Sequence, residues 1–207
     1  MTVLDVDAVA VRGVDTARLA GLHPQFPARW SPRALAPEPI TVAQMETLLE
    51  AARWAPSCYN EQPWRFAYAL RGDDRWQAFF DVLVEGNQAW AANAGALVAI
   101  AARRYFERNG EPNPAYAFDT GAAWMSLALQ ASHMGLVAHG MLGFHRDAAR
   151  EKLALPDAYD LCAMVAVGPP GDKRALPEAL QERETPSPRK PLRETAFRGG
   201  FAALATP

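Results

Sequence analysis

The sequence has very little cysteine, with only Cys58 and Cys162 among its 207 residues. Two cysteines cannot form a disulfide framework or a cysteine-rich metal cluster, and such low usage is typical of a reducing compartment. The sequence also lacks an excess of either charge, because 21 basic residues stand against 23 acidic ones, for a formal net charge of −2. This balance argues against electrostatic binding to nucleic acid or to an anionic membrane surface.

Long hydrophobic runs are missing as well. The longest, residues 94–102, is too short to cross a bilayer. The first twenty residues carry Asp and Arg where a signal peptide would have an apolar core. We therefore expect a soluble, cytoplasmic protein that does not associate with membranes. Half of the residues are apolar and 21% are charged, which suits one globular domain, with or without extended arms.

The sequence also lacks the common nucleotide-binding signatures. No strand-like segment leads into G-x-G-x-x-G or G-x-x-x-x-G-K-[ST], and the glycines at 140, 143, 168 and 171 fit neither spacing. This argues against a Rossmann or P-loop site.

Two other chemistries are also disfavoured. The four histidines are scattered without matching cysteines or carboxylates, so we expect no metal site. Cys58 with His133 or His139 as its base would be an alternative nucleophile. No local signature supports that pair, and packing is the simpler interpretation of such a cysteine.

Periodic patterns predict a mixture of helices and strands. Thr41 and Gln44 have the spacing of a capping box, and the helix they begin should end before Pro56. Asp119 or Thr120 should cap a long apolar helix that Gly135 closes. The expected helices lie at 42–55, 75–84, 121–134 and 147–153, and the expected strands at 64–70, 95–102 and 161–168.

One candidate site is RWSPR, residues 29–33, within a proline-rich stretch at 23–39 that should be extended or turning rather than helical. In an extended chain Arg29, Ser31 and Arg33 would share one face. Two guanidinium groups and a hydroxyl suit a phosphate or a polarised carbonyl. A solvated basic loop is the alternative, and these five residues alone favour it.

A second candidate is APSCYNEQPWRF, residues 55–66, in which small polar groups lie between two prolines. Ser57, Asn60 and Gln62 present donors and acceptors from this stiffened loop. Asn87, just before a buried strand, is a further candidate, although capping a helix end would explain it equally well.

The basic pair that begins at Arg189 is a weaker candidate. This pair could bind the same anion as Arg29, but such a pattern usually indicates a solvated pair of charges.

In this order along the chain, these segments resemble the nitroreductase family of FMN-dependent oxidoreductases, and most closely its short members. The resemblance covers nearly everything after residue 25. Each segment is modest by itself, and their common order makes the match specific. The matching segments are RWSPRAL (29–35), LLEAARWAPSCYNEQPWRF (48–66), EGNQAWAANA (85–94), FDTGAA (118–123), LALQASHMGLVAHGMLGF (127–144), VAVGPPGD (165–172) and RKPL (189–192).

The resemblance implies an α+β fold, a three-layer α/β/α sandwich with a central, mainly antiparallel sheet. It also implies an intertwined homodimer with noncovalent FMN at the subunit interface. Residues 1–24 would form an N-terminal arm and 25–172 the FMN-binding domain. Residues 173–207 would form a C-terminal extension that wraps the partner subunit and contributes a phosphate contact. The apolar helix at 121–134 independently favours a buried face between two copies.

The resemblance also implies roles for individual residues. Arg29 and Ser31 match positions that hold the phosphate of FMN, with Trp30 at a variable position between them. Arg33 matches a basic residue near the N1/C2 edge of the flavin, where a cation favours the reduced state. Arg189 matches a C-terminal phosphate ligand.

The remaining matches concern the flavin ring. Ser57, Asn60 and Gln62 match a loop that reaches the flavin of the partner subunit, and Asn87 matches an asparagine beside the ring. A further segment has a backbone N–H that approaches flavin N5. It consists of Met141, Leu142 and Gly143.

The implied activity is ping-pong oxidation of NAD(P)H, with hydride passing through flavin N5 to a nitroaromatic, quinone or related acceptor. The flavin carries this chemistry, so no side chain is assigned as acid or base. One alternative is another flavin-based reduction, such as enal or semialdehyde reduction or dehalogenation. A non-enzymatic flavin-binding module is a second alternative.

Overall fold

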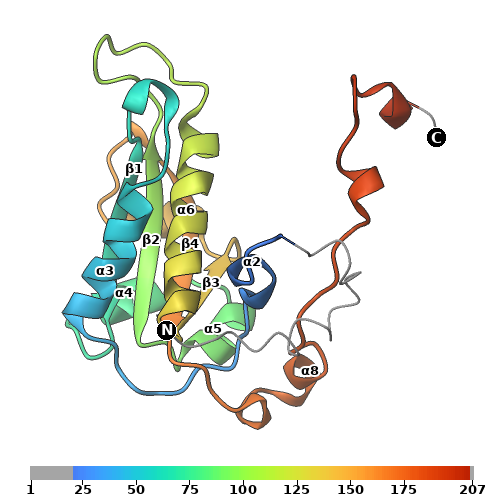
Figure 1. The fold of residues 1–207 in the computed structure, drawn as a ribbon. Helices are drawn as coiled ribbons and strands as arrows, with labels where there is room; N and C mark the ends of the chain where they lie inside the picture. Colours follow the sequence, from blue (N-terminus) through green and yellow to red (C-terminus); the bar gives the residue numbers. More distant parts are fainter. Residues whose placement is uncertain (1–20, 206–207) are drawn as a thin grey trace.

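The computed structural model describes residues 21–205, so the predicted N-terminal arm at 1–24 lies almost wholly outside the described residues. A four-stranded sheet forms the middle of the fold (Figure 1). All neighbouring strands in it are antiparallel, in the order β1 (Trp64–Leu70), β2 (Ala96–Arg103), β4 (Tyr159–Gly168) and β3 (Val137–Met141). The expected α+β class with an antiparallel sheet is confirmed.

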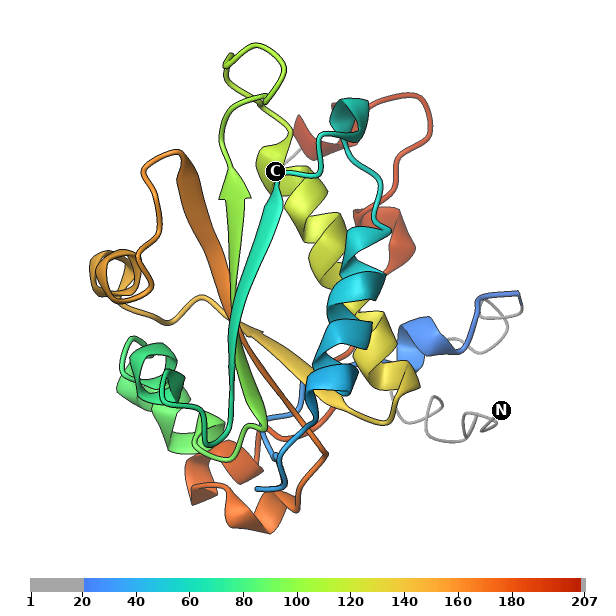
Figure 2. The same cartoon turned by 90° about the vertical axis from the view of Figure 1, so that its left-hand side faces the viewer.

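Helices cover both faces of the sheet, as Figure 2 shows. One face carries α3 (Val42–Arg53) and α6 (Tyr116–His133). The other face carries the shorter helices α4 (Trp76–Phe80), α5 (Glu85–Ala91) and α7 (Arg146–Lys152). The fold therefore has the three layers that the family resemblance implies.

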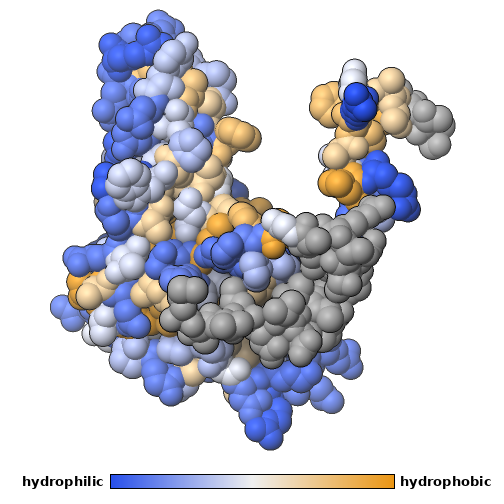
Figure 3. Space-filling model, viewed as in Figure 1, coloured by the Kyte–Doolittle hydropathy of each residue, from blue (hydrophilic) through white to orange (hydrophobic). Residues whose placement is uncertain are grey.

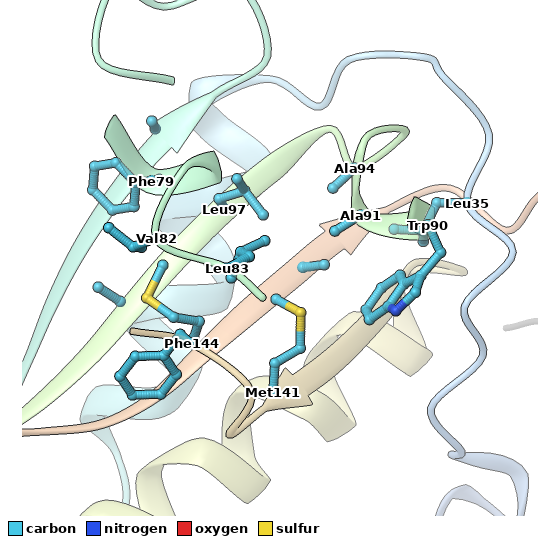
Figure 4. Packing of buried hydrophobic residues seen from close by; sticks show 14 of the residues in the cluster. Leu35, Phe79, Val82, Leu83, Trp90, Ala91, Ala94, Leu97, Met141 and Phe144 are labelled. Carbon is cyan, nitrogen blue, oxygen red and sulfur yellow. The ribbon is translucent and has the colours of Figure 1, made fainter. Parts of the chain in front are cut away.

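The central strand β2 explains why its sequence is a continuous apolar run. Its alternate side chains enter two different cores, because successive residues of a strand point to opposite faces. Val98 and Ile100 pack with α3 and α6, whereas Leu97 packs with the short helices on the opposite face. Figure 4 shows this second core, in which Leu97 lies among residues such as Phe79, Val82 and Leu83. A strand buried on both faces has no polar positions to alternate.

Local signals placed the start of α3 correctly. The hydroxyl of Thr41 accepts a hydrogen bond from the Gln44 N–H (3.1 Å), and the Gln44 side chain accepts one from the Thr41 N–H (2.8 Å). The predicted capping box is therefore confirmed.

The start of the long helix was predicted wrongly, since α6 begins at Tyr116 rather than near residue 121. The two expected caps have other partners. The Asp119 carboxylate accepts a hydrogen bond from the N–H of Cys58 (3.0 Å), and the Thr120 hydroxyl donates to the Tyr116 carbonyl (2.7 Å). The predicted end is close, because Gly135 follows the helix with φ of +71°.

Two further predictions are corrected. The helix expected at 75–84 stops at Phe80, because Leu83 forms an antiparallel bridge with Phe144 instead of continuing the helix. The stretch at 23–39 contains one helical turn, α2 (Gln25–Ala28). Pro27 is tolerated there because the first turn of a helix does not need its N–H group.

After β4 the chain forms the short helix α8 (Glu178–Gln181) and then an arm that leaves the body of the molecule (Figure 1). The arm exposes large apolar side chains, including Leu192 at 65% and Phe201 at 74%. Figure 3 shows apolar surface on this arm, which stands apart from the rest of the molecule. None of the helices within residues 21–205 has the length and apolarity that crossing a bilayer would need.

Candidate functional site

The RWSPR segment leaves α2 in an extended conformation, with φ −69° and ψ 123° at Arg29. The Arg29 guanidinium donates a hydrogen bond to the Ser31 hydroxyl at 3.2 Å. These two side chains therefore lie together, as the extended backbone predicts. The side chain of Arg33 has a different partner, because its Nη1 lies 4.0 Å from the Glu184 carboxylate.

A second arginine acts electrostatically on Arg29. Partial burial of the Arg29 guanidinium and the positive charge of Arg189 both lower the pKa of Arg29, burial being the larger cause. Arg29 is thus in contact with Ser31 and under the electrostatic influence of Arg189, which comes from a distant segment of the chain. Two guanidinium groups and a hydroxyl are a donor set suited to a phosphate or carboxylate.

Asn87 is part of α5 rather than of a loop before β2. Its side-chain amide donates to the carbonyl of Gly143 at 2.9 Å, and the backbone N–H of Val84 donates to the same carbonyl at 3.1 Å. Asn87 therefore holds the loop that follows β3, and capping a helix end does not explain it. Met141, the last residue of β3, is buried, and Leu142 in that loop is 71% exposed.

His139 joins this region to the RWSPR segment. Its Nδ1 lies 2.9 Å from the carbonyl oxygen of Pro32, and its ring packs on Trp90 with 4.5 Å between ring centroids. Burial is the main cause that lowers the pKa of His139, which favours the neutral ring. Because a carbonyl only accepts, Nδ1 must carry the proton in this contact.

A cavity of about 340 Å³ lies beside the RWSPR segment. The last turn of α6 and the chain after β4 complete its wall. Arg29, Trp30, Lys173 and Glu184 contribute to the lining. The volume falls within the usual range for small-molecule sites.

The loop at 55–66 has an unusual backbone. Tyr59, Asn60 and Gln62 all have positive φ, at 52°, 57° and 50°. Non-glycine residues adopt this region at a cost, and such strain tends to occur at functional sites. The Ser57 hydroxyl stabilises the turn by accepting a hydrogen bond from the Gln62 N–H at 3.0 Å.

This loop and the RWSPR segment lie at opposite ends of α6. The loop contacts Asp119 at the start of the helix, whereas the cavity beside RWSPR reaches Ser132 at its end. These positions are about 20 Å apart at 1.5 Å per residue. Figure 1 shows α2 and the loop after α3 toward opposite ends of α6. Within one chain, Ser57, Asn60 and Gln62 therefore do not join the other predicted site residues.

Sequence reasoning missed His139 and Glu184. A lone histidine on an apolar strand is a weak signal, and an acidic residue in a charged tail is no signal at all. Within residues 21–205, no three His, Cys, Asp or Glu side chains are grouped as metal ligands.

The model of the nitroreductase family matches residues 27–169 of this chain, which is most of its length. The chain belongs to the nitroreductase family. A solved structure described as an oxidoreductase containing FMN shares 45% identity with it, with a TM-score of 0.84. The similarity covers 87% of this chain and 93% of that one.

Two curated proteins are also similar. An uncharacterized 15.4 kDa protein of Mycolicibacterium smegmatis is 36% identical over 131 residues, which are 61% of this chain and 84% of that protein. A protein of Archaeoglobus fulgidus, named as a candidate NADH dehydrogenase/NAD(P)H nitroreductase, is 27% identical over 155 residues, or 73% and 86% of the two chains.

The nitroreductase family match includes the RWSPR segment, the strained loop, Asn87 and residues 141–143, but it ends at residue 169. Arg189 and Glu184 lie beyond it. The assignment of Glu184 therefore rests on its contacts with Arg33 and Ala34, and that of Arg189 on its electrostatic effect on Arg29.

Proposed function

We propose that this nitroreductase-family protein binds FMN noncovalently and uses it to oxidise NAD(P)H. The observation that carries the proposal is the clustering of Arg29, Ser31 and Arg189, which supplies the donors that a phosphate requires. The structural relative at 45% identity contains FMN by its description, and the Archaeoglobus fulgidus relative is named for NAD(P)H.

The residues of this chain fit a flavin mononucleotide. Arg29, Ser31 and Arg189 would hold the phosphate. The loop from Met141 to Gly143 would lie along the ring, because Asn87 fixes its backbone and the missing side chain of Gly143 lets the loop pack closely against Asn87 and Val84. Arg33 would place a positive charge near the ring, which stabilises a ligand that gains negative charge on reduction.

Bound FMN would supply hydride acceptance and donation at N5. We propose a ping-pong order with a nitroaromatic, quinone or related small molecule as acceptor. The part of this chain is to bind and orient the cofactor and to leave one face accessible to both substrates. The exposed side chain of Leu142 gives that face an apolar, uncharged contact.

We further propose a homodimer with two shared sites. On α6, Phe118 is 84% exposed and Met125 37% exposed, and a two-fold contact would bury this apolar surface. Ser57, Asn60 and Gln62, about 20 Å from RWSPR along α6, would then meet the flavin of the other subunit. Residues 25–172 would form the FMN-binding domain, and the extension at 173–207 would wrap the partner.

The visible spectrum of the purified protein tests the proposal. We expect a yellow protein that releases FMN on heating and bleaches when NADH or NADPH is added without oxygen. A protein that carries FAD would contradict the proposal. So would one that remains colourless after reconstitution with FMN.

A further inference from the structure

Glu184 is a buried carboxylate in a part of the chain that is otherwise exposed. It retains 7% of its accessible surface. Its Oε1 accepts hydrogen bonds from two consecutive backbone N–H groups, those of Arg33 (2.6 Å) and Ala34 (2.8 Å). Its Oε2 lies 4.0 Å from the Arg33 guanidinium. Oε2 is buried and accepts no hydrogen bond among the described residues. The two N–H donors hold the carboxylate through Oε1, because removing either would leave a buried charge that is poorly compensated.

This contact joins distant parts of the chain. Arg33 and Ala34 lie in the same segment as Arg29 and Ser31. The Glu184 carboxylate therefore fixes the backbone that carries these two proposed phosphate ligands. No residue from 185 to 204 is buried, which makes Glu184 the last firm attachment of the C-terminal arm.

Arg189 lies five residues beyond that attachment, on a spacer that contains Pro186 and Pro188. Prolines restrict the spacer because their φ is fixed. The Arg189 Nη1 donates to the carbonyls of Ser187 (3.1 Å) and Pro188 (3.3 Å), so these hydrogen bonds remain within the arm itself.

We propose that Glu184 is a positioning residue for the phosphate of FMN. Its hydrogen bonds anchor the C-terminal arm to the RWSPR backbone and thereby keep Arg189 near Arg29. This inference rests on the proposed function, and it adds a residue and a mechanism that the family match does not cover.

Anchoring the C-terminal arm at Glu184 has an electrostatic and an entropic reason. Two guanidinium groups repel each other, and the positive charge of Arg189 is the smaller of two causes that lower the pKa of Arg29. Keeping the two groups in one neighbourhood therefore has an electrostatic cost. Anchoring at Glu184 gives Arg189 a high effective concentration at the phosphate, whereas a free arm would be ordered only at an entropic cost.

The test compares FMN with riboflavin, which lacks only the phosphate. Both dissociation constants are measured by flavin fluorescence on the full chain after its flavin is removed, for the wild type and for Glu184→Ala, Glu184→Gln and Glu182→Ala. The ratio of the two constants reports the phosphate site alone. We expect the wild type to prefer FMN by at least about tenfold, the loss typical of a charge-assisted contact.

Glu184→Ala should reduce the preference for FMN about tenfold, because the charge-assisted hydrogen bonds from the Arg33 and Ala34 N–H groups are lost and the arm is no longer anchored. Its affinity for riboflavin should change little. Glu184→Gln keeps an acceptor oxygen for the two N–H groups and should fall in between, which also provides a result if the alanine variant does not fold. Glu182→Ala removes an exposed charge from the same arm and should match the wild type.

A double-mutant comparison with Arg189→Ala completes the test. If Glu184 acts by presenting Arg189, then Glu184→Ala should have little further effect on the ratio in that background. If the two substitutions instead reduce the ratio independently, so that the double variant shows the product of their separate effects, the inference is overturned. An equal loss of FMN and riboflavin affinity would also overturn it, because that result indicates a general structural role.

The two hypotheses fail in different ways. A wild-type protein that binds neither flavin, or binds both equally, would overturn the proposed function and the inference with it. A wild type that prefers FMN, with Glu184 variants that keep the same preference, would overturn the inference alone.

Discussion

The side-chain amide of Asn87 donates a hydrogen bond to the carbonyl of Gly143, with 2.9 Å between nitrogen and oxygen. This contact ties α5 to the loop that leaves β3, across 56 residues of sequence. The packing is close, because a Cβ on Gly143 would lie 2.8 Å from the amide nitrogen of Asn87 and 2.9 Å from a methyl of Val84. The loop therefore has room for glycine only.

Gly143→Ala should accordingly destabilise the protein by about 1–3 kcal/mol, the usual cost of overpacking. It should also weaken FMN binding, since the loop must move. Gly86→Ala in the same helix α5 is the matched control, because its Cβ would meet nothing within 4 Å. Urea unfolding of both variants measures the difference. A Gly143→Ala variant as stable as the control would show that the loop adjusts freely.

Arg29→Ala should weaken FMN binding about tenfold to a hundredfold, because it removes a charge-assisted contact worth roughly 1.5–3 kcal/mol. Riboflavin affinity should be nearly unchanged. Arg53→Ala is a suitable control, since that arginine is exposed on α3 and pairs with exposed Glu50. Fluorescence titration gives the dissociation constants. An unchanged FMN affinity in a folded variant would place the phosphate elsewhere.

His139 should make stability depend on pH. Burial is the largest cause and lowers the pKa of His139 in the folded protein, and the charge of Arg33 acts in the same direction. Hydrogen bonds to the backbone of Pro32 and Ser31 and the charge of Glu184 oppose it with smaller effects. The unfolded chain therefore binds more protons between that lowered pKa and the ordinary value of about 6.5. The stabilisation is complete above that ordinary value and is lost as the pH falls through the window.

His139→Gln should flatten this dependence, because glutamine can still donate to the Pro32 carbonyl but does not titrate. His133→Gln, at an exposed position of α6, should leave the dependence as it is. Denaturant unfolding between pH 5 and 8 provides the comparison. Equal slopes for the wild type and His139→Gln would assign the pH dependence to other groups.

Phe118→Glu should disrupt the proposed dimer. Phe118 is 84% exposed on α6, so a charge there costs little in the single chain but would be buried between two copies. We expect sedimentation to show a dimer for the wild type and a monomer for the variant, with FMN binding weakened because the strained loop of the partner is lost. A wild-type protein that binds FMN as a monomer at micromolar concentration would refute the shared site.

Local features of this protein could be predicted from the sequence because their causes are local. The capping box of Thr41 and Gln44 spans three residues, and the burial of β2 follows from its own apolar run. The same holds for the extended RWSPR backbone, whose proline acts on the residue before it. The order of these motifs along the chain was sufficient to indicate the family.

Only the tertiary structure decided the features that depend on distant partners. Asp119 does not cap α6 because its carboxylate binds the N–H of Cys58, 61 residues away. Glu184 became a candidate only through its contacts with Arg33 and Ala34, 151 and 150 residues away. Likewise, the length of α6 separates the strained loop from the RWSPR segment. Hydrogen bonds and burial between such segments depend on how the sheet and helices pack, and no local pattern records that packing.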